Sequence, residues 1–186
     1  MIEAVEWVVG VRGITATPCQ AHQLPQPYRH LLDHKGNMTP RLAQFHNVSL
    51  DKVRLAVLDS SIVELVPKGE RLLQRRVVLH GPDFHLYEVG AIRIFVDRLP
   101  ERIRDEVLKA TKPLGSLLLA QKVDQTSRVE GFFQTSSFEV VVSELKSKIS
   151  QISIDCSAGE AFGRKNVLVS STGVTLAEVI ELIPPM

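Results

Sequence analysis

The sequence has few cysteines, no excess of either charge and no long hydrophobic run. Its two cysteines, Cys19 and Cys156, lack the spacing of metal ligands, which predicts free thiols in a reducing compartment. A net charge of +1 without a basic run argues against nucleic acid or an anionic membrane as the main partner. The apolar runs fall far short of the roughly 20 residues that span a bilayer, and the acidic start MIEAVE lacks the basic region of a signal peptide. We therefore expect a cytoplasmic protein.

Motifs that would identify a nucleotide site or a covalent catalyst are also missing. The sequence contains neither GxGxxG nor a Walker A motif, and no serine lies in a GxSxG elbow. Neither cysteine has the local signs of an activated thiol. These absences argue against a nucleotide site and against a serine or cysteine nucleophile.

The size and composition of the chain suit one globular domain. With 186 residues, of which 44% are hydrophobic, the chain can bury roughly 70% of its unfolded surface. Such a core needs no disulfide or metal to hold it together. We therefore expect residues 1–186 to form a single domain.

Strand and helix patterns follow one another in an order typical of an antiparallel sheet. Apolar alternation predicts strands at residues 53–58 and 62–66, joined by a turn at 59–61, and further strands at 72–79 and 86–96. Strand-like composition also marks residues 132–142, 149–155, 166–170 and 174–183. Helical pairs are expected within residues 28–45 and 100–120. The order predicts an α+β fold, with a single antiparallel sheet of about six strands, helices on one face and a ligand site between them.

Residues 72–79, LLQRRVVL, predict a buried strand that carries an arginine on its core-facing side. Strand side chains alternate between faces, so Arg75 shares its face with the apolar Leu73 and Val77. Burying a guanidinium costs several kcal/mol unless an anion meets it. We therefore expect Arg75 to meet a carboxylate, preferably that of a ligand, and Arg76 to be a solvated charge on the other face.

Three segments, in the same order, resemble the chorismate lyase family, also called chorismate pyruvate-lyase or 4-hydroxybenzoate synthase. They are LLDHKGNMTPRL at residues 31–42, the run from GERLLQRRVV to TKPLGSLL at 69–118, and FGRKNVLVSSTGVTLAEVIELIP at 162–184. Together they cover about half of the chain. The resemblance implies a chorismate lyase-like fold and an enzyme that converts chorismate to 4-hydroxybenzoate and pyruvate by carbon–oxygen elimination. It also implies no metal, no organic cofactor, and a product for ubiquinone, plastoquinone or other phenolic biosynthesis.

The same resemblance assigns roles to particular residues. Arg75 and the main-chain N–H groups of Met38 and Leu114 would hold the ring carboxylate. Met38 stands in MTP, a predicted helix start whose free N–H groups favour an anion. Glu178 would be the catalytic glutamate that meets the retained ring hydroxyl, with Arg75 as the second catalytic residue. Glu181 is the alternative, because each face of the last strand carries one of the two glutamates.

Some positions depart from the family pattern. Many chorismate lyases carry a second arginine where this chain has Ala91. Arg93 lies on the same strand face and is expected to supply the missing charge to the enolpyruvyl carboxylate, unless substrate preference or rate differs. Residues 1–25, a leader, and 123–160, an insertion, match the family poorly.

Two other classes of function stay open beside the enzyme. Effector-binding domains of some bacterial transcription regulators resemble the same fold and bind small molecules such as aromatic carboxylates without chemistry. Residues 1–25 are too short and insufficiently basic for a DNA-reading helix-turn-helix, and the presence of both Arg75 and Glu178 favours the enzyme. A structural protein in which Arg75 pairs with Glu178 is the third class. We therefore predict a lyase that binds chorismate and 4-hydroxybenzoate and no nucleic acid.

Overall fold

The computed structural model describes residues 15–65, 69–153 and 159–186. Its central feature is a seven-stranded sheet in the order β1-β5-β6-β7-β4-β3-β2, in which every neighbouring pair of strands is antiparallel. The strands are β1 (Thr17–Cys19), β2 (Arg54–Leu65), β3 (Glu70–His80), β4 (Leu86–Phe95), β5 (Gln125–Thr135), β6 (Ala161–Ser170) and β7 (Thr175–Ile183).

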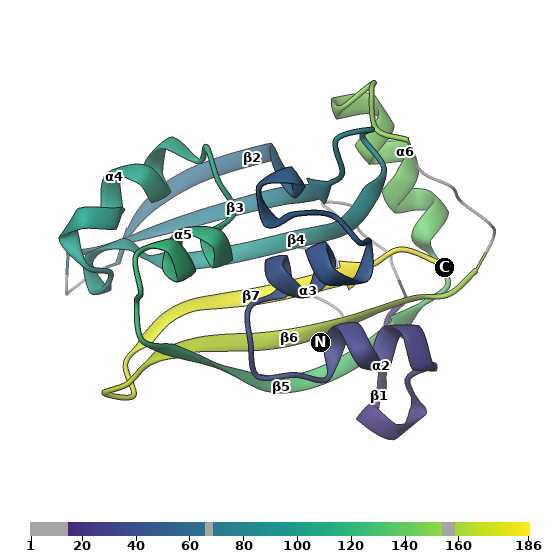
Figure 1. Cartoon of the computed structure of the whole chain (residues 1–186), viewed down its shortest axis with the longest axis horizontal. Helices are drawn as coiled ribbons and strands as arrows, with labels where there is room; N and C mark the ends of the chain where they lie inside the picture. The colour runs from purple at the N-terminus through teal and green to yellow at the C-terminus, as the bar shows by residue number, and fades with distance from the viewer. Residues whose placement is uncertain (1–14, 66–68, 154–158) are drawn as a thin grey trace.

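Four helices lie over one face of this sheet, as Figure 1 shows. They are α2 (Gln26–Leu32), α3 (Met38–Phe45), α4 (Glu101–Lys109) and α5 (Leu114–Ala120). One more helix, α6 (Phe138–Lys148), packs against the other face near one end of the sheet. Short 3-10 turns complete the chain at η1 (Ala21–Gln23), η2 (Leu50–Lys52) and η3 (Val96–Arg98). The predicted α+β fold, with a single antiparallel sheet, is confirmed.

The helix-covered face has two hydrophobic clusters with a space between them. One cluster lies under α2 and α3 and includes Leu31, Leu42 and Leu79. The other lies under α4 and α5 and includes Ile103 and Leu117. A third cluster fills the opposite face beneath α6. Because residues of both helix-side clusters line one pocket, the fold itself leaves a cavity between the two halves of the core.

The predicted hairpin at residues 53–66 is wrong, because β2 is one continuous strand. Asp59, Ser60 and Ser61, expected to form a turn, pair in register with β3. A bulge between Val57 and Asp59 shifts the register by one residue at that point. β2 is the edge strand, where exposed polar side chains are common, and Asp59 forms an ion pair with Arg76. Polar residues in mid-strand therefore signalled an edge, not a turn.

The strand expected over residues 132–142 is also wrong beyond its first few residues. β5 ends at Thr135, and α6 begins at Phe138. Phe138, Val141, Val142 and Leu145 are buried at helical spacing against the sheet. Residues 1–14 of the predicted leader, and residues 154–158 with Cys156 and the end of the strand predicted at 149–155, lie outside the described residues.

In the part of the chain that the structure describes, no helix has the length and apolar character needed to cross a membrane.

Candidate functional site

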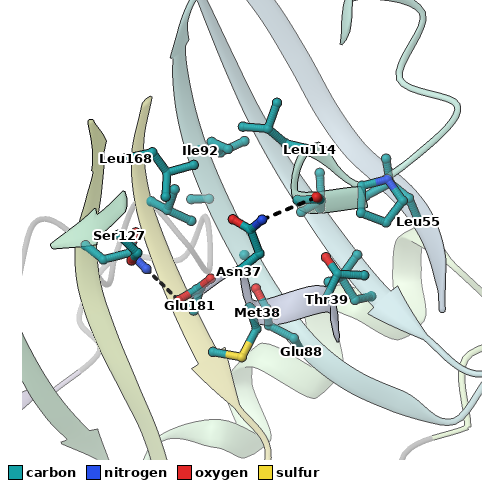
Figure 2. Close-up of a pocket in the computed structure, with 18 of the residues that line it drawn as sticks. Asn37, Met38, Thr39, Leu55, Glu88, Ile92, Leu114, Ser127, Leu168 and Glu181 are labelled. Carbon is teal, nitrogen blue, oxygen red and sulfur yellow. Dashed lines mark hydrogen bonds between the residues drawn. The ribbon is translucent and has the colours of Figure 1, made fainter. Parts of the chain in front are cut away.

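A pocket lies between the sheet and the helices above it (Figure 2). Its floor and walls come from β2 to β7, and its roof comes from the starts of α3 and α5. It offers about 80 Å³ to the centres of water-sized spheres. Since one water needs roughly 10–15 Å³ of such space, the pocket has room for about five to eight waters. It can therefore hold a small organic molecule with a single ring, and is too small for a dinucleotide.

Two helix starts meet at the roof of the pocket. Met38 is the first residue of α3, Leu114 is the first residue of α5, and both line the pocket. The Asn37 side-chain amide donates to the Gly115 carbonyl at 3.5 Å. A side chain at Gly115 would place its Cβ 3.1 Å from Thr39 Oγ1, so glycine permits this close approach of the two helices. The structure thus brings both backbone positions named by the resemblance to one pocket.

Arg75 is buried, with 5% of its surface exposed, and it lines the pocket. Its Nη1 and Nη2 donate to the Val107 carbonyl at 3.0 and 3.1 Å, in the last turn of α4. Among the described residues, no carboxylate forms a salt bridge with Arg75, and burial lowers the pKa of its guanidinium. The pairing of Arg75 with Glu178, considered for a structural protein, does not form. The buried cation is met only by neutral backbone and hydroxyl groups.

Arg76 lies on the opposite face of β3, as strand alternation predicts, but it is not a solvated charge. Only 11% of its side chain is exposed, and it forms ion pairs with Asp59 of β2 and Glu144 of α6. The prediction of a solvated Arg76 is therefore wrong, because α6 covers this part of the opposite face.

The two glutamates of β7 face opposite sides of the sheet. Glu181 is buried and lines the pocket, whereas Glu178 is 37% exposed and is not among the pocket residues. Glu178 instead lies 3.5 Å from Arg93, which is 44% exposed, also on the side away from the pocket. The structure therefore brings Glu181, the alternative, to Arg75, Met38 and Leu114, and leaves Glu178 and Arg93 outside.

Ala91 also belongs to the side of the sheet covered by α6, where it is fully buried in the hydrophobic cluster. An arginine at this position would meet apolar side chains of that cluster. The absence of the second family arginine is therefore compatible with the packing of α6.

A cluster of buried polar residues at the pocket was missed by sequence reasoning. Arg164 is fully buried, forms an ion pair with Glu181, and donates to the carbonyls of Leu32 and His34 at 2.8 and 2.9 Å. Asn166 donates to the same Glu181 oxygen at 2.8 Å. Alternation in FGRKN was the available signal, because it puts Arg164 and Asn166 on one face of β6.

Glu88 of β4 completes this cluster. Its carboxyl group lies over Gly90, where an added Cβ would be 3.1 Å from Glu88 Oε1. Burial first, and then the nearby Glu181 carboxylate, raise the pKa of Glu88 well above its ordinary value of 4.5. Arg164 opposes this rise but does not reverse it. Glu88 therefore keeps its proton to a higher pH than an exposed glutamate does.

No protein-family model and no curated protein matches the sequence. Solved structures with a similar fold include the effector domain of PhnF from Mycobacterium smegmatis, with a TM-score of 0.52 and 13% identity over 80% of this chain and 88% of that chain. A second structure of PhnF has a TM-score of 0.51 and 10% identity over 99% of this chain and 94% of that chain. A gene product of Staphylococcus aureus has a TM-score of 0.51 and 9% identity over 82% of this chain and 90% of that chain. These TM-scores show a shared fold, and at identities this low the similarity shows nothing beyond the fold.

These comparisons contradict the prediction that the chain is an enzyme. The similar structures include an effector domain, which is the class of the alternative interpretation, and none of the three is described as a chorismate lyase. In the pocket, the glutamate beside Arg75, Met38 and Leu114 is Glu181, the alternative, and Glu178 lies outside it. The comparisons support the chorismate lyase-like fold and give no support to the lyase activity.

Proposed function

We propose that this chain is a non-catalytic binding domain for a small organic anion, with an aromatic carboxylate as the expected ligand. Arg75 carries the proposal, since it is a buried guanidinium in a pocket wall without a carboxylate partner among the described residues. Buried charges in proteins are generally paired with an opposite charge. A bound anion would supply that opposite charge.

Arg75 retains hydrogen-bonding capacity for such a ligand. A guanidinium has five N–H groups. Val107 accepts two bonds, and Ser60 Oγ and the Leu108 carbonyl accept longer ones at 3.4 and 3.5 Å. The remaining N–H group and the net positive charge are available to an anion. The helix end that Arg75 contacts compensates only about half of a unit charge.

The surroundings of Arg75 favour an anion with an apolar body. Lys112 and the helix starts at Met38 and Leu114 add positive potential to the same pocket. Ile92, Leu168 and other aliphatic side chains make up most of the remaining wall. A ring with one carboxylate matches both the apolar wall and the size of the pocket. Benzoate, 4-hydroxybenzoate and chorismate are therefore the first ligands to test.

The test is calorimetric titration of benzoate, 4-hydroxybenzoate and chorismate into the whole chain and its variants. Arg75→Met should weaken binding by about 10- to 150-fold, the equivalent of one charge-assisted hydrogen bond of ~1.5–3 kcal/mol. Arg75→Lys keeps the charge and should lose less. Arg93→Met removes an arginine from the other face of the sheet and is the control, with unchanged affinity expected.

Equal affinities for wild type and Arg75→Met would contradict the proposal, as would the absence of binding for all three compounds. Chorismate should be recovered unchanged after incubation with the protein. Formation of 4-hydroxybenzoate, followed by its absorbance, would contradict the non-catalytic assignment.

A further inference from the structure

Two buried side-chain oxygens on neighbouring strands of the pocket wall have no hydrogen-bond partner among the described residues. They are Ser127 Oγ of β5 and Asn166 Oδ1 of β6. Both residues are 1% exposed, and both line the pocket. Buried polar atoms in folded proteins are rarely left without a partner. This pair therefore indicates that a bound molecule supplies hydrogen bonds at this point of the wall.

The register of the sheet places these two residues close together. Ser127 pairs with Leu168, which is two residues from Asn166 on the same face of β6. Ser127 and Asn166 are therefore diagonal neighbours on the antiparallel pair of β5 and β6. Diagonal neighbours lie roughly 7–8 Å apart at the backbone, and both of these side chains line the same pocket. One ligand atom between them can therefore contact both oxygens.

The neighbours of Asn166 fix its hydrogen-bond role. The Glu181 carboxylate, in an ion pair with Arg164, accepts a bond from the Asn166 side-chain nitrogen at 2.8 Å. The amide oxygen of Asn166 is therefore left for the ligand, and it can only accept. The Ser127 hydroxyl can accept as well, but its hydrogen also needs an acceptor. A group that donates to Asn166 and accepts from Ser127 satisfies both residues, and a hydroxyl is such a group.

The pair lies across an apolar floor from Arg75. The strand registers define one row of the sheet, which runs across β3, β4, β7 and β6 through Arg75, Ile92, Val179 and Asn166. Three strand spacings of about 4.8 Å separate its two ends, which is roughly 14 Å between Cα atoms. Ile92 and Val179 also line the pocket and form the floor between these ends. A ring with polar groups on opposite sides, hydrogen-bonded at both ends, spans a similar length.

Resting on the proposed function, we propose that the ligand carries a hydroxyl group on the side opposite its anionic group, and that this hydroxyl donates to Asn166 Oδ1 and accepts from Ser127 Oγ. The anionic group lies at Arg75, and the apolar body of the ligand lies on the floor between. An aromatic amino group can donate to Asn166 but is a poor acceptor for the Ser127 hydrogen, and a methyl group leaves both oxygens unpaired. The pocket should therefore prefer hydroxyl over amino, and amino over methyl.

The experiment compares benzoates that carry a hydroxyl, an amino or a methyl group, three substituents of nearly equal size, in calorimetric titrations of the whole chain. Both the 3- and the 4-substituted isomers are used, because they cover the reach between Arg75 and Asn166. One hydroxybenzoate should bind at least about tenfold more tightly than its methyl counterpart, with the amino compound between them. Benzoate itself is the reference for binding through Arg75.

Two variants assign the preference to this pair. Ser127→Ala removes an oxygen that has no partner among the described residues, so the fold should tolerate it, and the preference for hydroxyl over methyl should fall to within about threefold. Asn166→Leu removes the acceptor and should reduce the same preference to a similar extent. Should Asn166→Leu fold poorly because its bond to Glu181 is lost, Ser127→Ala decides the question alone. Thr126→Val removes an exposed hydroxyl from the adjacent position of β5 and is the matched control, with an unchanged preference expected.

Benzoates that bind through Arg75 without preference for a hydroxyl would overturn this inference and leave the proposed function standing. A preference that survives in Ser127→Ala would overturn it as well, because another group of the pocket would then recognise the hydroxyl. Failure of every compound to bind, including benzoate itself, would overturn both.

Discussion

Glu88→Gln is expected to stabilise the fold at neutral and alkaline pH. Burial and the neighbouring Glu181 carboxylate raise the pKa of Glu88 well above 4.5, its ordinary value and the one it regains in the unfolded chain. Between the unfolded and folded pKa values, the folded protein binds more protons than the unfolded chain does. The free energy of unfolding therefore decreases as the pH rises through this window, and it levels off above the folded pKa.

The magnitude follows from the size of the shift. Each unit by which the folded pKa of Glu88 exceeds 4.5 lowers the wild-type free energy of unfolding by about 1.4 kcal/mol at a pH above both values. Glutamine has nearly the same shape and does not ionise, so the variant avoids this loss. Below the ordinary pKa, both side chains are neutral and the two proteins should have similar stability.

Urea unfolding of wild type and Glu88→Gln from about pH 4 to pH 9 measures this difference directly. The stability of the variant relative to wild type should increase steadily as the pH rises above the ordinary glutamate pKa. Glu178→Gln, on the other face of the sheet, controls for the general effect of removing one carboxylate. A difference between wild type and Glu88→Gln that does not change with pH would refute the raised pKa of the buried Glu88.

Two further variants test the packing around the pocket. Arg164→Met leaves the Glu181 carboxylate buried without its cation and should lower the free energy of unfolding by about 3–5 kcal/mol, whereas Arg71→Met, which breaks a more exposed pair with Asp97, should lower it much less. A small loss in Arg164→Met would show that Glu181 finds another partner. Gly163→Ala places a Cβ 2.3 Å from Phe133 Cζ and 2.5 Å from the Glu181 carbonyl oxygen, so it should destabilise the fold by about 1–3 kcal/mol or more. Gly36→Ala, whose added Cβ has only an ordinary contact at 3.6 Å, is the control, and equal melting temperatures for these two variants would contradict this packing argument.

Local sequence patterns were sufficient to predict features that depend on a single strand or helix. Alternation in LLQRRVVL placed Arg75 on the buried face of β3 and Arg76 on the other, as the structure has them. Pro100 marked the start of α4, because proline suits the positions around a helix N-terminus. The order of strands with short connections predicted an antiparallel sheet, since parallel strands need long crossovers.

Patterns within one strand could not decide which face meets the helices. Glu178 and Glu181 lie on opposite faces of β7, and each face also carries apolar residues. Only the register of β7 between β4 and β6 brings Glu181 beside Arg164 and leaves Glu178 beside Arg93. The two glutamates are three positions apart, and this odd spacing puts one in the pocket and the other outside it.

By itself, the sequence determined the class of fold and the burial of Arg75, because backbone periodicity and turn chemistry are local properties. Only the tertiary structure decided that Glu88, Asn166 and Ser127 line one pocket, since these residues come from three strands and lie 39 and 78 positions apart from Glu88 in the chain. It also decided that Arg164 forms its ion pair with Glu181 and that, within the described residues, no cation forms a salt bridge with Glu88. The charge and hydrogen-bonding state of a buried group depend on all of its neighbours in space, and a linear sequence does not specify those neighbours.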